Sequence, residues 1–220
     1  MPGIIDIPNS TLLFYFSFYI QTYVERDIRT LENIEGFATF RQFLGLLSVL
    51  SYQEINYSQL GTELGITPKT AQRWLKLLTY TYQWTELQSF HMNNIKRLSV
   101  KPKGIIFDTG LSCYQQRISS PEAFGVSPMQ GAFFESYCFN MIKAFCSSLP
   151  LMPNFYHWRT LAGVEVDILV EIDGIFYPIE VKSATSVSKN EVRGIISFRE
   201  TYPHLKIAPG IVIYIGDECY

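Results

Sequence analysis

The segment from Val164 to Lys182 constrains the fold of this chain more than any other part of the sequence. Residues 164–170 alternate acidic and aliphatic side chains, which is typical of a strand with two different faces. Asp173 and Gly174 follow as a strong two-residue hairpin turn, and residues 175–182 return as the partner strand. A turn at 173–174 also sets the register, because facing residues then lie equally far from the turn.

This register brings acidic side chains face to face. Asp167 lies opposite Glu180, in a pair without main-chain hydrogen bonds, where side chains approach most closely. Two facing carboxylates destabilise a sheet unless a positive charge compensates them. Mg²⁺ or Mn²⁺ prefers such oxygen ligands and leaves positions open for water and a phosphate oxygen. We therefore predict a divalent metal held by Asp167 and Glu180; the alternative is an exposed sheet face with surface ion pairs.

Three further residues belong to this prediction. Lys182 shares a face with Glu180 and is placed to act on the attacking water or to stabilise the charge developing on a phosphate. Glu135, on the predicted helix before the hairpin, would support the metal through a bound water. Arg159 either clamps a phosphate with two hydrogen bonds or pairs with Glu165 or Glu171.

Basic residues gather in the middle of the chain. The formal net charge is −2, yet residues 61–117 contain eight basic and three acidic side chains. This balance excludes a uniformly basic nucleic-acid coat, but it indicates a local surface that faces a polyanion. A solvated surface without a partner is the alternative.

The same region reads as a helix-turn-helix. Gly65 ends a short helix, and Thr67 and Pro68 are typical of the start of a second one. One face of the second helix is apolar and should pack inward, through Ala71, Trp74, Leu75 and Leu78. The opposite face would contact DNA in the major groove, through Lys69, Thr70, Gln72, Arg73 and Lys76.

Two strand-like segments follow, at 87–90 and 95–100. With Lys96, Arg97 and the nearby Lys101 and Lys103 they would form a wing against the phosphates. Winged helices also join proteins to one another, so a purely structural role stays open. Asp108 is most simply the N-cap of a helix.

The chain as a whole predicts an α+β protein in three parts. Residues 1–54 form a helical segment, in which aromatic residues at helical spacing are packing surface. Residues 55–125 form the winged-helix-like DNA-binding module. Residues 126–220 read as helix, three strands, helix and strand.

Several classes of site are excluded. A phosphate-binding loop would need glycine at positions 63 and 68, where the chain has Glu63 and Pro68, so we expect no nucleotide site. The four cysteines form no CxxC pair and are expected to be reduced thiols of a cytoplasmic protein. The apolar run 12–20 is too short to span a membrane, and no secretory leader is expected.

At this point the motifs resemble a known family. Asp167, the run Glu180-Val181-Lys182 and Glu135 look like the PD-(D/E)xK, restriction-endonuclease-like superfamily. Nearly the whole chain is similar to the C-terminal half of prokaryotic predicted AAA-type ATPases, which contains the domain of unknown function 4143. The matching stretches are 23–29, 69–75, 107–111, 131–135, 158–159, 165–167 and 179–183. The resemblance implies a winged helix followed by a restriction-endonuclease-like α/β domain; the N-terminal ATPase half is absent, so ATP binding does not carry over.

Two functions follow as expectations. The first is a Mg²⁺- or Mn²⁺-dependent DNA endonuclease, with Asp167, Glu180, Lys182 and Glu135 as its catalytic residues and DNA as its partner. The alternative is a non-catalytic module, a degenerate nuclease fold that binds nucleic acid or protein within an ATPase system. A transcription regulator is a third possibility, but it would require dimerisation. A separate ATPase or a second copy is a possible partner, and a membrane is not.

Overall fold

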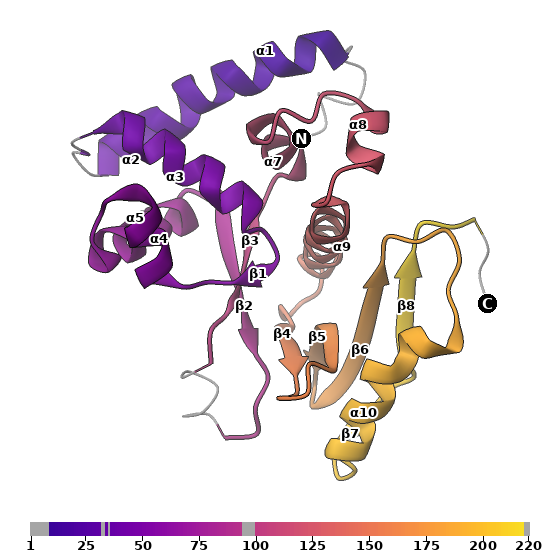
Figure 1. The fold of residues 1–220 in the computed structure, drawn as a ribbon. Helices are drawn as coiled ribbons and strands as arrows, with labels where there is room; N and C mark the ends of the chain where they lie inside the picture. The colour runs from indigo at the N-terminus through magenta and orange to yellow at the C-terminus, as the bar shows by residue number, and fades with distance from the viewer. Residues whose placement is uncertain (1–8, 32–33, 35, 94–99, 218–220) are drawn as a thin grey trace. The chain divides into compact units, whose positions relative to one another are not determined.

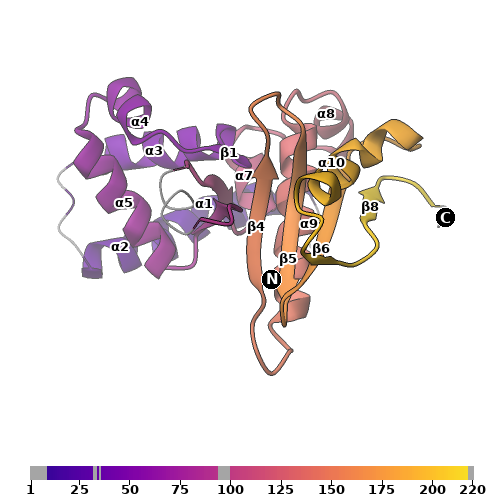
Figure 2. The same ribbon diagram turned by 90° about the horizontal axis from the view of Figure 1, so that it is seen from below.

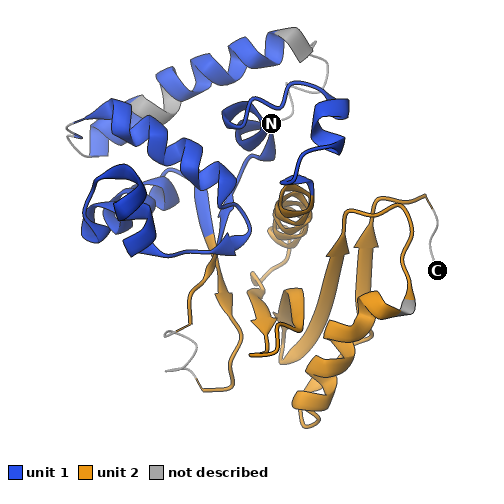
Figure 3. Cartoon of the chain, in the orientation of Figure 1, with its two compact units in different colours: residues 1–85, 104–130 blue, residues 86–103, 131–220 orange. Residues whose placement is uncertain are grey.

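The computed structural model describes residues 9–31, 34, 36–93 and 100–217, and the chain divides into two compact units (Figure 3). Unit 1 comprises residues 1–85 and 104–130, and unit 2 comprises residues 86–103 and 131–220. Residues 86–103, which the sequence placed in the middle module, therefore group with the C-terminal part. Lys96 and Arg97 lie outside the described residues.

Unit 1 is built mainly from helices, and their order along the chain can be followed in Figure 1. Its helices are α1 (Asn9–Tyr19), the π-helix η2 (Ile20–Val24), α2 (Glu25–Leu31), α3 (Phe37–Val49), α4 (Tyr57–Leu64), α5 (Pro68–Tyr80), α7 (Thr109–Gln115) and α8 (Pro121–Gly125). Three strands of the described residues lie wholly or partly in this unit, β1 (Gln53–Glu54), β2 (Trp84–Ser89) and β3 (Lys103–Ile106). No helix of the described residues is long and apolar enough to cross a lipid bilayer.

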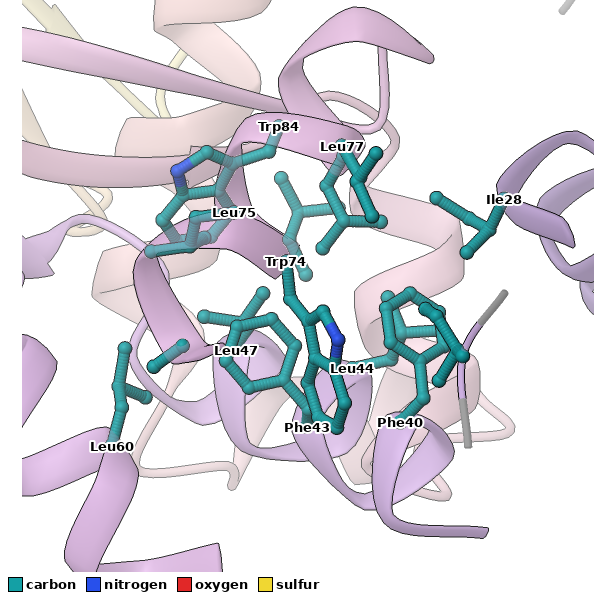
Figure 4. Packing of buried hydrophobic residues seen from close by; sticks show 14 of the residues in the cluster. Ile28, Phe40, Phe43, Leu44, Leu47, Leu60, Trp74, Leu75, Leu77 and Trp84 are labelled. Carbon is teal, nitrogen blue, oxygen red and sulfur yellow. The ribbon is translucent and has the colours of Figure 1, made fainter. Parts of the chain in front are cut away.

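The core of unit 1 is aromatic and aliphatic. Trp74 of α5 packs edge-to-face against Phe40 and Phe43 of α3, with ring centroids 5.3 Å apart in both pairs (Figure 4). The predicted inner face of α5 is buried, at Ala71, Trp74, Leu75 and Leu78. The aromatic spacing of the N-terminal helices therefore marks packing surface here, as expected.

Local signals define the ends of α4 and α5. Gly65 has a φ of 64° and ends α4 in the left-handed conformation that favours glycine. The Thr67 side chain accepts a hydrogen bond from the Thr70 N–H, so it caps α5 as predicted. Asn56 caps α4 by accepting from the Ser58 and Gln59 amides; Ser58, which also has the chemistry of a cap, lies inside the helix.

Unit 2 is a mixed sheet with helices. Its elements are α9 (Gln130–Cys146), β4 (Asn154–Arg159), β5 (Glu165–Ile172), β6 (Ile175–Lys182), the 3₁₀-helix η3 (Lys189–Val192), α10 (Arg193–Thr201), β7 (Lys206–Ile207) and β8 (Ile211–Tyr214). This is the predicted order of helix, three strands, helix and strand, with the two-residue β7 added. The molecule is thus α+β, with helices followed by a mixed sheet.

The β5–β6 hairpin has the register expected from the sequence. Ile172 pairs with Ile175, and the ladder continues to Ile168 opposite Ile179. The turn residues Asp173 and Gly174 have φ values of 50° and 75°, which the preferred two-residue hairpin turn requires.

Helices cover opposite faces of this sheet (Figure 2). Phe155 of β4 contacts Phe139 of α9, whereas its neighbour Tyr156 belongs to the buried cluster that contains Phe198 of α10. Neighbouring residues of a strand point to opposite faces, so α9 and α10 lie on different sides of the strands.

The segment expected as the first wing strand lies largely in β2, which has β3 on one side and β4 on the other in the strand order. Gln88 and Ser89 of β2 pair in parallel with Tyr156 and His157 of β4. Residues 88–89 therefore extend the sheet of unit 2. Most of the second expected strand, at 95–100, falls outside the described residues.

Candidate functional site

Three of the predicted residues meet at the end of the β5–β6 hairpin. The Lys182 ammonium lies 3.0 Å from Glu180 Oε2 and 3.4 Å from Asp167 Oδ2. Both acidic residues are buried, at 1% exposure for Asp167 and 2% for Glu180. The two carboxylates thus reach the same positive charge and point into the same region.

The backbone holds Asp167 in this position. Its Oδ2 accepts a hydrogen bond of 2.8 Å from the Val181 amide, so a side chain of β5 binds the main chain of β6. On the other side of β5 the register with β4 shifts between Tyr156 and Trp158. His157 therefore faces two residues of β5, Asp167 and Ile168, in a β-bulge of the kind that redirects side chains beside active sites.

A glycine of α10 brings that helix close to the Glu180 carboxylate and to the main chain of Glu165. A Cβ atom on Gly194 would collide with the main-chain oxygen of Glu165 and with Glu180 Oε1. Only a residue without a side chain permits this approach. The α10 backbone therefore forms one wall beside Glu180.

Glu135 of α9 lies within electrostatic range of the site. Burial, and then the negative charge of Asp167, raise the pKa of the Glu135 carboxyl to about 8. The ammonium groups of Lys103 and Lys182 act in the opposite direction. Glu135 thus takes part in the same charge network as the residues of the hairpin.

Charged neighbours in the hairpin alter the pKa values of Glu180 and Lys182. Burial and the charge of Asp167 raise the pKa of Glu180 to about 8, and contact with Lys182 opposes this. Burial acts to lower the pKa of Lys182, but Asp167 and Glu180 outweigh it and raise that pKa above its ordinary value. Lys182 is therefore a firmly charged ammonium, while Glu180 has a high affinity for a proton.

Two residues of the network were not singled out as site residues from the sequence. Lys103, which was expected to face phosphates in a wing, is only 5% exposed, and its ammonium lies 3.8 Å from Glu165 Oε2. The short apolar run Gly104–Ile106 after it is a signal that Lys103 begins a buried strand. His157 lies between Tyr156 and Trp158, so strand alternation points its side chain away from that aromatic pair. Burial, and then the charge of Lys103, lower the pKa of His157 to about 3.

Arg159 is half-exposed and lies beside Glu165, with 3.8 Å between Nε and Oε2. The sequence offered Glu165 and Glu171 as partners of Arg159, and the contact is with Glu165. Glu171 instead accepts a hydrogen bond from the Tyr156 hydroxyl. The guanidinium group remains at the surface, where a phosphate could reach it.

The predicted DNA-contacting residues of α5 belong to the other unit. They lie in unit 1, on the face opposite Trp74, where Lys69, Gln72, Arg73 and Lys76 are exposed and Thr70 is half-buried.

The side chains present suit a small divalent ion coordinated largely by water. Among the described residues, no group of three or more His, Cys, Asp and Glu side chains is arranged to hold a metal. Mg²⁺ commonly needs only one or two carboxylates and completes its shell with water and substrate phosphates. Asp167 and Glu180 provide such a pair of hard oxygen donors.

Comparisons with known proteins identify relatives but no activity. The family described as Domain of unknown function (DUF8612) matches residues 1–122, and Domain of unknown function (DUF4143) matches residues 130–220. Uncharacterized protein Mb2031c of Mycobacterium bovis and Uncharacterized protein Rv2008c of Mycobacterium tuberculosis are each 30% identical over 200 residues. These matches cover 91% of this chain but 43% of either relative. No solved structure matches the chain.

Proposed function

The chain belongs to the family described as Domain of unknown function (DUF8612), and we propose that it is a divalent-cation-dependent phosphodiesterase of the PD-(D/E)xK endonuclease type that acts on DNA. One observation carries the proposal: two buried carboxylates, Asp167 and Glu180, converge on the ammonium group of Lys182. The alternative expected from the sequence, an exposed sheet face with surface ion pairs, does not describe Asp167 and Glu180, because both are buried.

Each residue of the site has a role in this proposal. Asp167 and Glu180 would hold the cation, and Glu135 would bind one of its water molecules. The bound cation would supply positive charge to the phosphate and lower the pKa of a water molecule. Lys182 would donate a hydrogen bond to a phosphate oxygen, and Arg159 would bind the phosphate from the surface.

DNA is proposed as the substrate because of α5. Its exposed face carries Lys69, Arg73 and Lys76 on a helix that follows a glycine turn. Such a helix can enter a major groove, and its basic side chains can neutralise phosphates.

The proposal is tested with the isosteric variant Asp167→Asn. We expect Mn²⁺ to raise the melting temperature of the unchanged protein by roughly 5 °C at saturating concentration and to support nicking of plasmid DNA. Asp167→Asn should abolish both effects, because it removes one of the two charged ligands. The matched control is Asp217→Asn, which changes an exposed aspartate and should preserve both.

The competing function, a binding module without catalysis, predicts a different result. The protein would then bind DNA or a partner protein, but Mn²⁺ would not raise its melting temperature. DNA binding without any metal-dependent stabilisation would contradict the nuclease proposal.

A further inference from the structure

The Lys182 ammonium group contacts both of the carboxylates that are proposed to hold a cation. It contacts one oxygen of each carboxylate, Asp167 Oδ2 and Glu180 Oε2, at 3.4 and 3.0 Å. These are the oxygens that would approach a divalent cation shared by the two residues. One positive charge is therefore already present between them.

Solvent reaches this position beside Lys182. The Lys182 side chain is 33% exposed, whereas the side chains of Asp167 and Glu180 are 2% and 3% exposed. The Val181 amide binds Asp167, and the α10 backbone at Gly194 closes off Glu180. A cation that arrives from solvent thus meets the lysine before it meets the carboxylates.

We propose that Lys182 is a built-in occupant of the cation position, which a divalent ion must displace, so that this residue determines which cations the site accepts. The inference rests on the proposed function, because it concerns the same metal site. It gives the Lys182 side chain two positions. Without metal the ammonium group contacts the two carboxylates, and with metal bound it lies beside the phosphate.

The physical reason is charge. A monovalent ion carries the same charge as the ammonium group that it would replace, and it brings no electrostatic gain. A divalent ion brings twice that charge to two carboxylates in a site of low solvent exposure, where Coulomb interactions are strong. The flexible four-carbon stem of lysine allows the ammonium group to move aside.

The test is a calorimetric titration with Mn²⁺, without substrate, at about pH 8.5, because the pKa of Glu180 is about 8. Lys182→Met removes the competing charge, and Lys182→Gln removes it while retaining a hydrogen-bond donor, should the methionine variant fold poorly. Lys206→Met is the control, since it removes an exposed lysine of the same unit. We expect both Lys182 variants to bind Mn²⁺ about tenfold more tightly than the unchanged protein, and Lys206→Met to match the unchanged protein.

The outcomes separate the two proposals. Mn²⁺ binding that is equal or weaker in the folded Lys182 variants overturns the displacement of Lys182 and leaves the metal site intact. Absence of Mn²⁺ binding by every protein overturns the proposed function and this inference with it. The inference is supported if Lys182→Gln binds Mn²⁺ more tightly than the unchanged protein and if adding Asp167→Asn to that variant removes the gain in affinity.

Discussion

At the scale of single residues, the site is dominated by the cost of burying charge. Glu135 and Glu180 both have pKa values of about 8, chiefly through burial and then through Asp167. A carboxyl group whose pKa is higher in the folded protein binds a proton more tightly there than in the unfolded chain. Such a group stabilises the fold at low pH and loses that contribution as pH rises towards 8.

This gives a prediction for Glu135→Gln. Between about pH 4.5 and pH 8 the unfolded chain releases the Glu135 proton while the buried carboxyl keeps it. The unchanged protein should therefore lose stability over this range, and the neutral amide of the variant should not contribute to that loss. The variant should therefore gain about 4–5 kcal/mol relative to the unchanged protein across this range, measured by urea unfolding at several pH values. Glu200 is exposed, so the difference in the free energy of unfolding between Glu200→Gln and the unchanged protein should not change with pH. A constant difference for Glu135→Gln as well would show that Glu135 is ionised throughout.

At the scale of elements, α5 has one buried apolar face and one exposed polar face. Its inner face is fixed in the core of unit 1 by Trp74, Leu75 and Leu78. Its outer face is polar and basic and needs no packing role. Substitutions on the outer face should therefore alter binding without altering the fold.

We predict that Lys69→Ala combined with Lys76→Ala weakens binding to duplex DNA. Each lost phosphate contact should reduce the slope of log affinity against log salt concentration by about one, so the double variant should lose about two. Fluorescence anisotropy at several salt concentrations measures this slope. Lys206→Ala, in unit 2, should keep the original slope; an unchanged slope in the double variant would exclude α5 as the DNA-contacting helix.

At the scale of the whole molecule, the basic helix and the carboxylate cluster belong to different units. The helix α5 lies in unit 1, whereas Asp167, Glu180, Lys182, Glu135 and Lys103 all lie in unit 2. Lys103 lies within residues 1–122, which the first family matches, although it belongs to unit 2. The other four residues lie within 130–220, which the second family matches. The charge network therefore draws on both matched regions.

We predict that Mn²⁺ protects unit 2 selectively from hydrogen exchange. The main-chain amides of 165–182 should exchange more slowly with Mn²⁺, because the ion would link the two strands of the hairpin. Peptides from 57–80 should be unaffected. Exchange measured by mass spectrometry, with Asp167→Asn as the control, tests this; equal protection of both regions would argue against a local metal site.

Local patterns in the sequence determined much of this structure. The Asp173–Gly174 turn and the alternation of residues 164–170 predicted the hairpin and its register. Thr67 and Asp108 were identified as helix caps, and both accept hydrogen bonds from the helix amides. These features depend on residues close together in the chain, where turn geometry and side-chain chemistry decide the conformation.

Only the tertiary structure decided the environment of the charged groups. Lys103 was expected at a surface but is buried at the start of β3, beside Glu165 of β5, which is distant in sequence. The bulge at Asp167, the approach of Gly194 and the raised pKa of Glu135 depend in the same way on other elements. Side-chain alternation fixes which way a residue points along its strand, but burial and charge depend on what the rest of the chain places against it.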